Sequence, residues 1–225
     1  MAITIVGTPQ VGNAIDGGDV TLTFDVTPAQ NDVVVVFGGS GSFRSPNPAA
    51  PGSGYTQIAL NTTSVFFGAW YKRMDVSPDS SVLCHGSANV NDATAYGCYV
   101  LRGVDTTTFA DAAATTAGVT TSTNPDCPSI TTVTNNAWVL ALAGSRVTDG
   151  AITAPSGYSN HYTTVASDGA SITVAGVTLE KTTAGAENPP AWSNWASGNW
   201  YAITVAVRPA VTTVTTGAAF LLRMI

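Results

Sequence analysis

Apolar and polar residues alternate in short runs along most of this chain, and each run ends at a turn signal. The runs are rich in Val, Ile, Thr and aromatic residues, and Gly, Pro, Asn and Asp separate them, as in β-strands joined by turns. Only residues 105–120 suggest a helical turn or a long loop. Many short strands without intervening helices predict an all-β antiparallel sandwich or jelly roll. The expected strands are 19–26, 32–38, 55–60, 64–73, 81–86, 94–102, 129–134, 137–143, 157–165, 171–180, 191–196 and 199–207.

Four segments of the first half recur in the second half in the same order, at a nearly constant offset of between 103 and 108 residues. The match places Gly68 over Gly176 and Arg102 over Arg208. The matching pairs are NDVVVVFGGS (31–40) with NAWVLALAGS (136–145), PGSGYTQ (51–57) with APSGYSN (154–160), VFFGAWYKR (65–73) with TVAGVTLEK (173–181), and ATAYGCYVLRG (93–103) with NWYAITVAVRP (199–209).

This recurrence predicts two copies of one five-strand unit, residues 19–104 and 129–209, within one domain spanning residues 1–210. Strand 32–38 should then superpose on 137–143, and strand 94–102 on 200–208. The alternative is that two β-rich halves with similar turns match by chance. The remaining residues, 211–225, form a C-terminal arm in this interpretation.

Three tryptophans fall within PAWSNWASGNWY, residues 190–201. The turn signal ASGN predicts a hairpin that places Trp195 opposite Trp200. Because side chains alternate between the faces of a strand, Trp192 should point into the core and the other two should lie on the outer face. Such a pair fits three roles, namely a stabilising cross-strand contact, a contact with a protein partner, or a carbohydrate-binding platform.

The cysteines are Cys84, Cys98 and Cys127. The segment from Val82 to Leu101 resembles a hairpin centred near Asn91, and that centre would place Cys84 opposite Cys98, within reach of a cross-strand disulfide. A register shift of one residue would remove this pairing. Since the chain starts without a basic, apolar leader, reduced thiols are the default expectation.

Charge and composition narrow the functional classes. Charged residues make up 10% of the chain and the net charge is −6, which disfavours binding to duplex nucleic acid or to an anionic membrane surface. The sequence contains none of the common catalytic or phosphate-binding motifs, and its two histidines are His85 and His161. We therefore expect a chain that is not an enzyme, that holds no metal or other cofactor, and that is made in a cytoplasm.

Several strand and turn signatures resemble a β-sandwich module of tailed-bacteriophage virion proteins and of some bacterial surface proteins. These signatures are YVLRGVDTTT (99–108), PSITTVTNNAWVLAL (128–142) and YAITVAVRPA (201–210), and the resemblance covers roughly residues 3–210. The resemblance implies a capsid decoration, head-fibre or tail-associated protein and implies no catalytic residue.

The expected function is therefore that of a non-enzymatic capsid decoration or cement protein located in the virion. Its expected partners are the major capsid protein or a tail protein, and further copies of itself in a homo-oligomer such as a trimer. The alternative is a carbohydrate-binding module of a tail or surface adhesin. An exposed Trp195 and Trp200 ledge would favour the alternative, whereas the same ledge buried at a subunit contact would favour the shell protein.

Residues 211–225 read VTTVTTGAAFLLRMI. Large apolar residues at an exposed terminus are unusual for a free monomer. The segment is either a last strand packed on its own sandwich or an arm that docks on a neighbouring subunit or shell. The residues expected to dock are Phe220, Leu221, Leu222, Met224 and Ile225.

Overall fold

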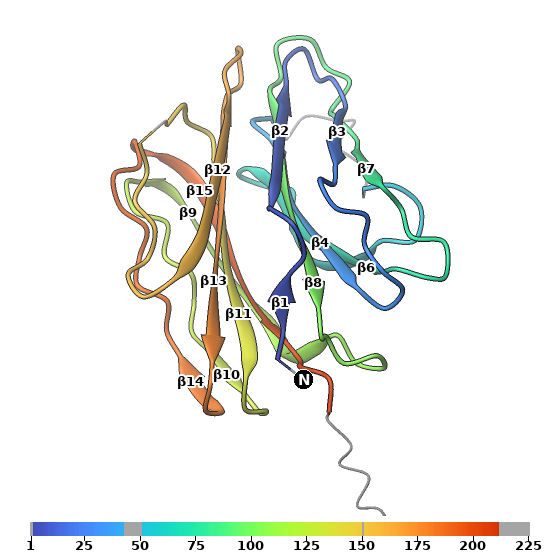
Figure 1. Ribbon diagram of the computed structural model, residues 1–225. Helices are drawn as coiled ribbons and strands as arrows, with labels where there is room; N and C mark the ends of the chain where they lie inside the picture. Colours follow the sequence, from blue (N-terminus) through green and yellow to red (C-terminus); the bar gives the residue numbers. More distant parts are fainter. Residues whose placement is uncertain (1, 43–50, 150, 212–225) are drawn as a thin grey trace, which may run out of the picture.

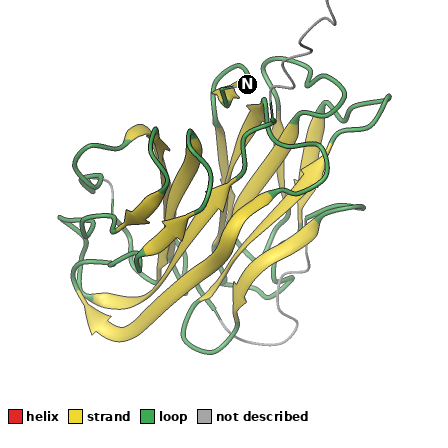
Figure 2. Ribbon diagram, turned by 90° about the horizontal axis from the view of Figure 1, so that it is seen from below, coloured by secondary structure: helices red, strands yellow, loops and turns green. Residues whose placement is uncertain are grey.

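A computed structural model describes residues 2–42, 51–149 and 151–211 of the chain. These residues form strands joined by turns and loops, and Figure 2 shows no helix among them. The described part of the chain therefore has no helix that could span a membrane. The strands are β1 (Thr4–Ile5), β2 (Gln10–Ala14), β3 (Val20–Thr23), β4 (Val33–Ser40), β5 (Thr56–Asn61), β6 (Phe66–Arg73), β7 (Ser81–Cys84), β8 (Thr94–Arg102), β9 (Ala110–Ser122), β10 (Ile130–Thr132), β11 (Ala137–Ser145), β12 (Ser159–Ala166), β13 (Ile172–Lys181), β14 (Gly185–Glu187) and β15 (Gly198–Val207).

Two antiparallel sheets face each other, and each is built from one half of the chain (Figure 1). The first has the order β1-β8-β4-β6-β5, with β2 also paired to β8, and the second has the order β9-β15-β11-β13-β12. A two-stranded ribbon accompanies each sheet, β3 with β7 in the first half and β10 with β14 in the second. The predicted antiparallel sandwich is confirmed, and the shared strand order supports the predicted duplication.

Turn residues agree with the repeat in detail. Asn31 and Asn136 precede equivalent strands, β4 and β11, and both have positive φ angles, 71° and 59°. Gly54 and Gly157 precede β5 and β12, with φ angles of 85° and 84°. Left-handed backbone of this kind is readily adopted by glycine and tolerated by asparagine. The same turn chemistry therefore recurs at matching places of the two halves.

The expected match of Gly68 with Gly176 is shifted by one residue. In the first sheet Gly68 pairs with Gly38, whereas in the second sheet the residue equivalent to Gly38 is Ala143, which pairs with Ala175. The hydrogen-bond register thus aligns Gly68 with Ala175. Because the side chains of a strand alternate in direction, an offset of one residue would have placed the side chains of β6 and β13 on opposite faces.

The core is layered, because both faces of each main sheet are covered. In β4, Val33, Val35 and Phe37 point toward the second sheet, while Val34 and Val36 point toward the β3–β7 ribbon. The central cluster between the sheets takes buried residues from both halves. A separate cluster lies behind each sheet. This double burial explains why β4 has a continuous apolar run instead of an alternating one.

Two local predictions are wrong. Residues 105–120 were expected to form a helical turn or a loop, but most of them belong to β9, a strand of 13 residues. Residues 191–196 were expected to be a strand, but they form a loop, and the ribbon strand of this region is β14. In both cases the pairing of β15 determines the outcome. Its edge makes residues 110–122 a strand, β9, and its pairing with β9 and β11 leaves no edge for residues 191–196.

Candidate functional site

The three clustered tryptophans are core residues of the second half. Trp192, Trp195 and Trp200 are 0%, 4% and 5% exposed, and all belong to the cluster behind the second sheet. The rings of Trp192 and Trp195 meet edge to face, with centroids 6.2 Å apart. Trp192 is in the core as predicted, but the outward-facing ledge of Trp195 and Trp200 is not formed.

The reason lies in the pairing of β15. This strand is hydrogen-bonded to β11 on one side and to β9 on the other, so no edge is free for a hairpin with residues 191–196. That segment instead crosses the back of the sheet. The amide of Trp192 donates to the Pro125 carbonyl (2.9 Å), and Ser193 and Thr153 exchange two backbone hydrogen bonds. The indole rings of Trp195 and Trp200 are therefore covered by other parts of the chain, and they offer no platform to a sugar or a protein.

The cysteines are buried free thiols, and no disulfide joins Cys84 to Cys98. The expected hairpin is wrong, because β7 pairs with β3 whereas β8 pairs with β4 and β2. The side chains of Cys84 and Cys98 enter the same core cluster, one from the β3–β7 ribbon and the other from the first sheet. Burial raises the pKa of Cys98 and of Cys127 to about 12, and that of Cys84 further still. These thiols are therefore poor nucleophiles.

A groove opens along one side of the sandwich, between edge strands β5 and β9. Its volume is about 390 Å³, and apolar side chains from both halves line it. Tyr71 and Phe109 stack there with ring centroids 4.0 Å apart and planes within 9°. The side chains that line the groove include Ile58, Tyr71, Phe109, Ala112, Ala114 and Val205. Its apolar character suits another apolar chain better than a charged ligand.

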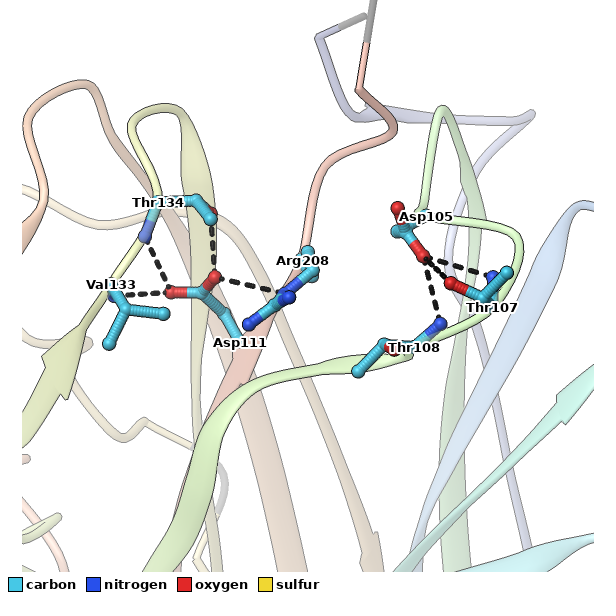
Figure 3. Close-up of polar contacts among 7 residues, drawn as sticks. All are labelled: Asp105, Thr107, Thr108, Asp111, Val133, Thr134 and Arg208. Atoms are coloured by element: carbon cyan, nitrogen blue, oxygen red, sulfur yellow. Dashed lines mark hydrogen bonds and ion pairs between the residues drawn. The ribbon is translucent and has the colours of Figure 1, made fainter.

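A buried carboxylate fixes the start of β9, and Figure 3 shows its surroundings. The side chain of Asp111 is fully buried and accepts hydrogen bonds from the Val133 amide (2.6 Å) and from the Thr134 hydroxyl (2.6 Å) and amide (3.2 Å). Arg208 forms an ion pair with it, Nε to Oδ1 at 3.4 Å. At this distance Arg208 supplies charge and not a hydrogen bond, consistent with the unsatisfied Nε atom.

The predicted equivalence of Arg102 and Arg208 has a structural counterpart. Arg102 is the last residue of β8, and Arg208 directly follows β15. Each pairs with a buried aspartate. The partner of Arg102 is Asp32, to which it donates two hydrogen bonds of 2.9 and 2.7 Å. The two aspartates come from different elements, since Asp32 precedes β4 and Asp111 lies in β9. The halves thus share the arginine but not the source of the carboxylate.

The loop that connects the two halves is held by an aspartate turn (Figure 3). One carboxylate oxygen of Asp105 accepts hydrogen bonds from the Thr107 hydroxyl (2.7 Å) and from the amides of Thr107 (2.9 Å) and Thr108 (2.8 Å). These bonds, the hydroxyl first, lower the pKa of Asp105 to about 2. The loop leads directly into Phe109 and the groove.

Other polar features lie at separate places in the described part of the chain. A cavity of about 270 Å³ at another place on the surface is lined by Asn91, Asp92 and Arg146, among others. His85 lies 3.5 Å from Asp19 at the surface, and His161 is near Trp192. In the described ranges, no three His, Cys, Asp or Glu side chains gather as metal ligands would. Of the features described, the groove is the one shaped for binding.

Comparisons with family models, with curated proteins and with solved structures find no match for this chain. The expected docking residues Phe220, Leu221, Leu222, Met224 and Ile225 lie outside the described residues. Sequence reasoning missed the groove, although one signal was present. The run ADAAATTAGVTTS, residues 110–122, has a single charged residue and no proline, which is unusual for the edge strand it forms.

Proposed function

We propose that this chain is a non-enzymatic structural protein of a tailed-phage virion, a capsid decoration or cement protein that binds shell proteins and its own copies. The observation that carries the proposal is the apolar groove between two open sheet edges, β5 and β9. A surface of this kind suits protein association. The resemblance of the strand and turn signatures to phage virion modules supplies the biological setting.

The scarcity of charge supports association through apolar contact and backbone hydrogen bonds. The chain has 8 basic and 14 acidic residues among 225. An immobilised protein must offset the entropy lost on binding, and repeated weak contacts within an oligomer achieve this through effective concentration. The carbohydrate-binding alternative has less support, because Trp195 and Trp200 are buried inside the second half.

The direct test is copurification with particles. Antiserum raised against the recombinant chain would be used to probe phage particles purified by density gradient from cells that produce the chain. We expect the chain in the particle band, at a fixed ratio to the major capsid or tail protein. Its absence from particles, with free chain in the supernatant, would contradict the proposal.

A second test concerns the attachment itself. Deleting residues 217–225 should leave the sandwich folded but weaken self-association or attachment to particles, as measured by sedimentation. For the full chain, attachment should survive about 0.5 M NaCl, because salt screens charge pairs and leaves apolar contacts in place. Equal binding by the deleted chain would assign no role to the arm, and release by moderate salt would contradict the apolar mechanism.

A further inference from the structure

The two long sides of the sandwich differ in how they are closed. On one side β12 lies next to β2, and the Asn13 side-chain amide donates to the Thr164 hydroxyl (3.1 Å) across the halves. On the other side lie β5 and β9, and each of them pairs with only one neighbouring strand within the described part of the chain. The outer backbone groups of both edges therefore face the groove side without a strand to bond.

The edge of β9 lacks the usual protection against further pairing. Natural proteins shield edge strands with lysines, prolines, short length or inward charges. β9 has 13 residues, no Lys, Arg or Pro, and mostly Ala, Thr and Gly side chains. Its one charged residue, Asp111, is buried and already bonded to Thr134. Such an edge is suited to accept an added strand.

The chain itself carries a segment that matches this edge. Residues 212–225, TTVTTGAAFLLRMI, follow the last described residue and begin with the Thr and Val pattern of a strand. They continue into five large apolar side chains and contain one charged residue, Arg223. The groove offers the apolar surface that these side chains need, including Ile58 and the stacked Tyr71 and Phe109.

The point where the segment leaves the fold favours docking between copies. The amides of Arg208 and Ala210 donate to the carbonyls of Phe109 (2.9 Å) and Gly103 (2.7 Å), so the described chain ends beside residues 103–109, which lead into β9. β9 lies between β15 and the open edge, so an added strand must lie on the side of β9 away from β15. A segment from a second copy approaches from outside, and 14 extended residues reach about 46 Å.

We propose that the groove between β5 and β9 receives residues 212–225 of a second copy. The incoming segment adds to the edge of β9 as a strand and packs Phe220 and Leu222, which share one face of that strand, against Tyr71 and Phe109. This inference rests on the proposed function, since it identifies the receiving surface for assembly through apolar contact.

Site-specific crosslinking in the full chain tests the inference. A photoreactive phenylalanine analogue would replace Phe220, and equal amounts of ¹⁴N- and ¹⁵N-labelled chains would be mixed before irradiation. Mass spectrometry then separates crosslinks between copies from crosslinks within one copy. We expect crosslinks between copies that map to residues 56–71 or 109–114. Crosslinks mapping elsewhere, crosslinks within single copies only, or none at all would overturn the inference.

A charged substitution in the groove provides the matched comparison. Ala114→Arg places a long cation among apolar side chains and should reduce both the crosslink yield and the association constant at least about tenfold. Thr21→Arg, at an exposed position of β3 on the other side of the first sheet, is the control and should change neither. Equal effects of the two substitutions, with circular dichroism showing both folded, would count against the groove.

The two proposals can fail separately. If the chain copurifies with particles but Phe220 crosslinks away from the groove, the proposed function stands and this inference is wrong. If the crosslinks map to the groove of a second copy but the chain is absent from particles, the docking site stands and the virion role is wrong.

Discussion

At the scale of single residues, the location of the aromatic side chains decides what their removal costs. Trp192, Trp195 and Trp200 fill the space behind the second sheet, where each touches the others or the apolar side chains of the same cluster. A tryptophan in such a position contributes to folding through packing. A tryptophan on a surface ledge would contribute mainly to binding.

Trp195→Ala should therefore lower the free energy of unfolding by about 3–5 kcal/mol, because it leaves a large cavity in a packed cluster. Urea denaturation followed by circular dichroism measures this loss. Val76→Ala, at a position 78% exposed, is the control and should change the free energy by less than about 0.5 kcal/mol. A loss below about 1 kcal/mol for Trp195→Ala would restore the surface interpretation.

The cysteines give a chemical test of burial. With a pKa of about 12, Cys98 and Cys127 carry almost no thiolate at pH 8, and Cys84 carries even less. Iodoacetamide at pH 8 should label none of the three thiols in the native protein and all three in urea. Reaction of Cys127 alone in urea without reductant would instead show that Cys84 and Cys98 are joined by a disulfide.

Asp105 offers a test in the acid range. Its pKa is lowered to about 2 from the ordinary aspartate value of 3.8, so the folded state is stabilised above pH 3.8 and loses this contribution as the pH falls toward 2. A ¹³C NMR titration of the carboxyl group should show the low pKa. Thr107→Val removes the largest cause, the hydroxyl hydrogen bond, and should move the pKa back toward its usual value. An unchanged pKa in this variant would contradict the assignment.

At the scale of elements, β9 depends on one buried carboxylate. Asp111 receives the amides of Val133 and Thr134 and pairs with Arg208, so it ties the start of β9 to the turn before β11 and to the end of β15. The groove keeps its shape only if β9 starts at this point. The contacts of Asp111 therefore help to hold the edge of β9 to which the second copy is proposed to bind.

Asp111→Ala should cost about 2–4 kcal/mol of unfolding free energy, since it leaves the buried donors of Val133 and Thr134 unsatisfied and removes the ion pair with Arg208. Thr134→Val, which removes one hydroxyl hydrogen bond, should cost about 1 kcal/mol. Thermal and urea unfolding measure both variants. If Asp111→Ala costs no more than Thr134→Val, the carboxylate is not the anchor described here.

Strands rich in Val and aromatic residues could be predicted from the sequence. Strands that form only because a neighbouring strand offers an edge could not. β4 and β8 are long runs of Val and aromatic residues, and the repeat added the correct equivalence to β11 and β15. β9 is rich in Ala, which favours helix in isolation, and only its place beside β15 makes it a strand. The Trp195 and Cys98 predictions failed because segments adjacent in the sequence were assumed to pair as hairpins. Here β7 and β8 belong to different sheets, and residues 191–196 form a loop behind the second sheet.

At the scale of the whole molecule, the two halves depend on each other. The largest core cluster lies between the sheets and takes Phe37 and Phe67 from one half and Leu140 and Leu142 from the other. Phe67 fits closely against Gly144 of the opposite sheet, where a Cβ atom would come within 2.3 Å of the ring. Neither half can bury its inner face without its partner.

Residues 1–105 and 106–225, produced separately, should therefore each lack a cooperative thermal transition and bind a hydrophobic dye. Mixing or coexpressing them should restore a sandwich with the circular dichroism spectrum of the intact chain. The intact chain under the same conditions is the control. A cooperative transition in either half alone, at the temperature of the intact protein, would show that the halves are independent domains.

The ends of the described chain meet at one residue. Ala210 donates its amide hydrogen to the Gly103 carbonyl, and Ala2 passes so close to Gly103 that a Cβ atom there would come within 2.3 Å of the Ala2 carbonyl oxygen. Figure 1 shows the N-terminus and the end of the described chain close together at one pole of the sandwich. A short linker between residues 2 and 211 could therefore close this part of the chain into a ring, and residues 2–211 could be spliced into a surface loop of another protein. The inserted sandwich would then be attached at one pole only, and its opposite pole would face the solvent.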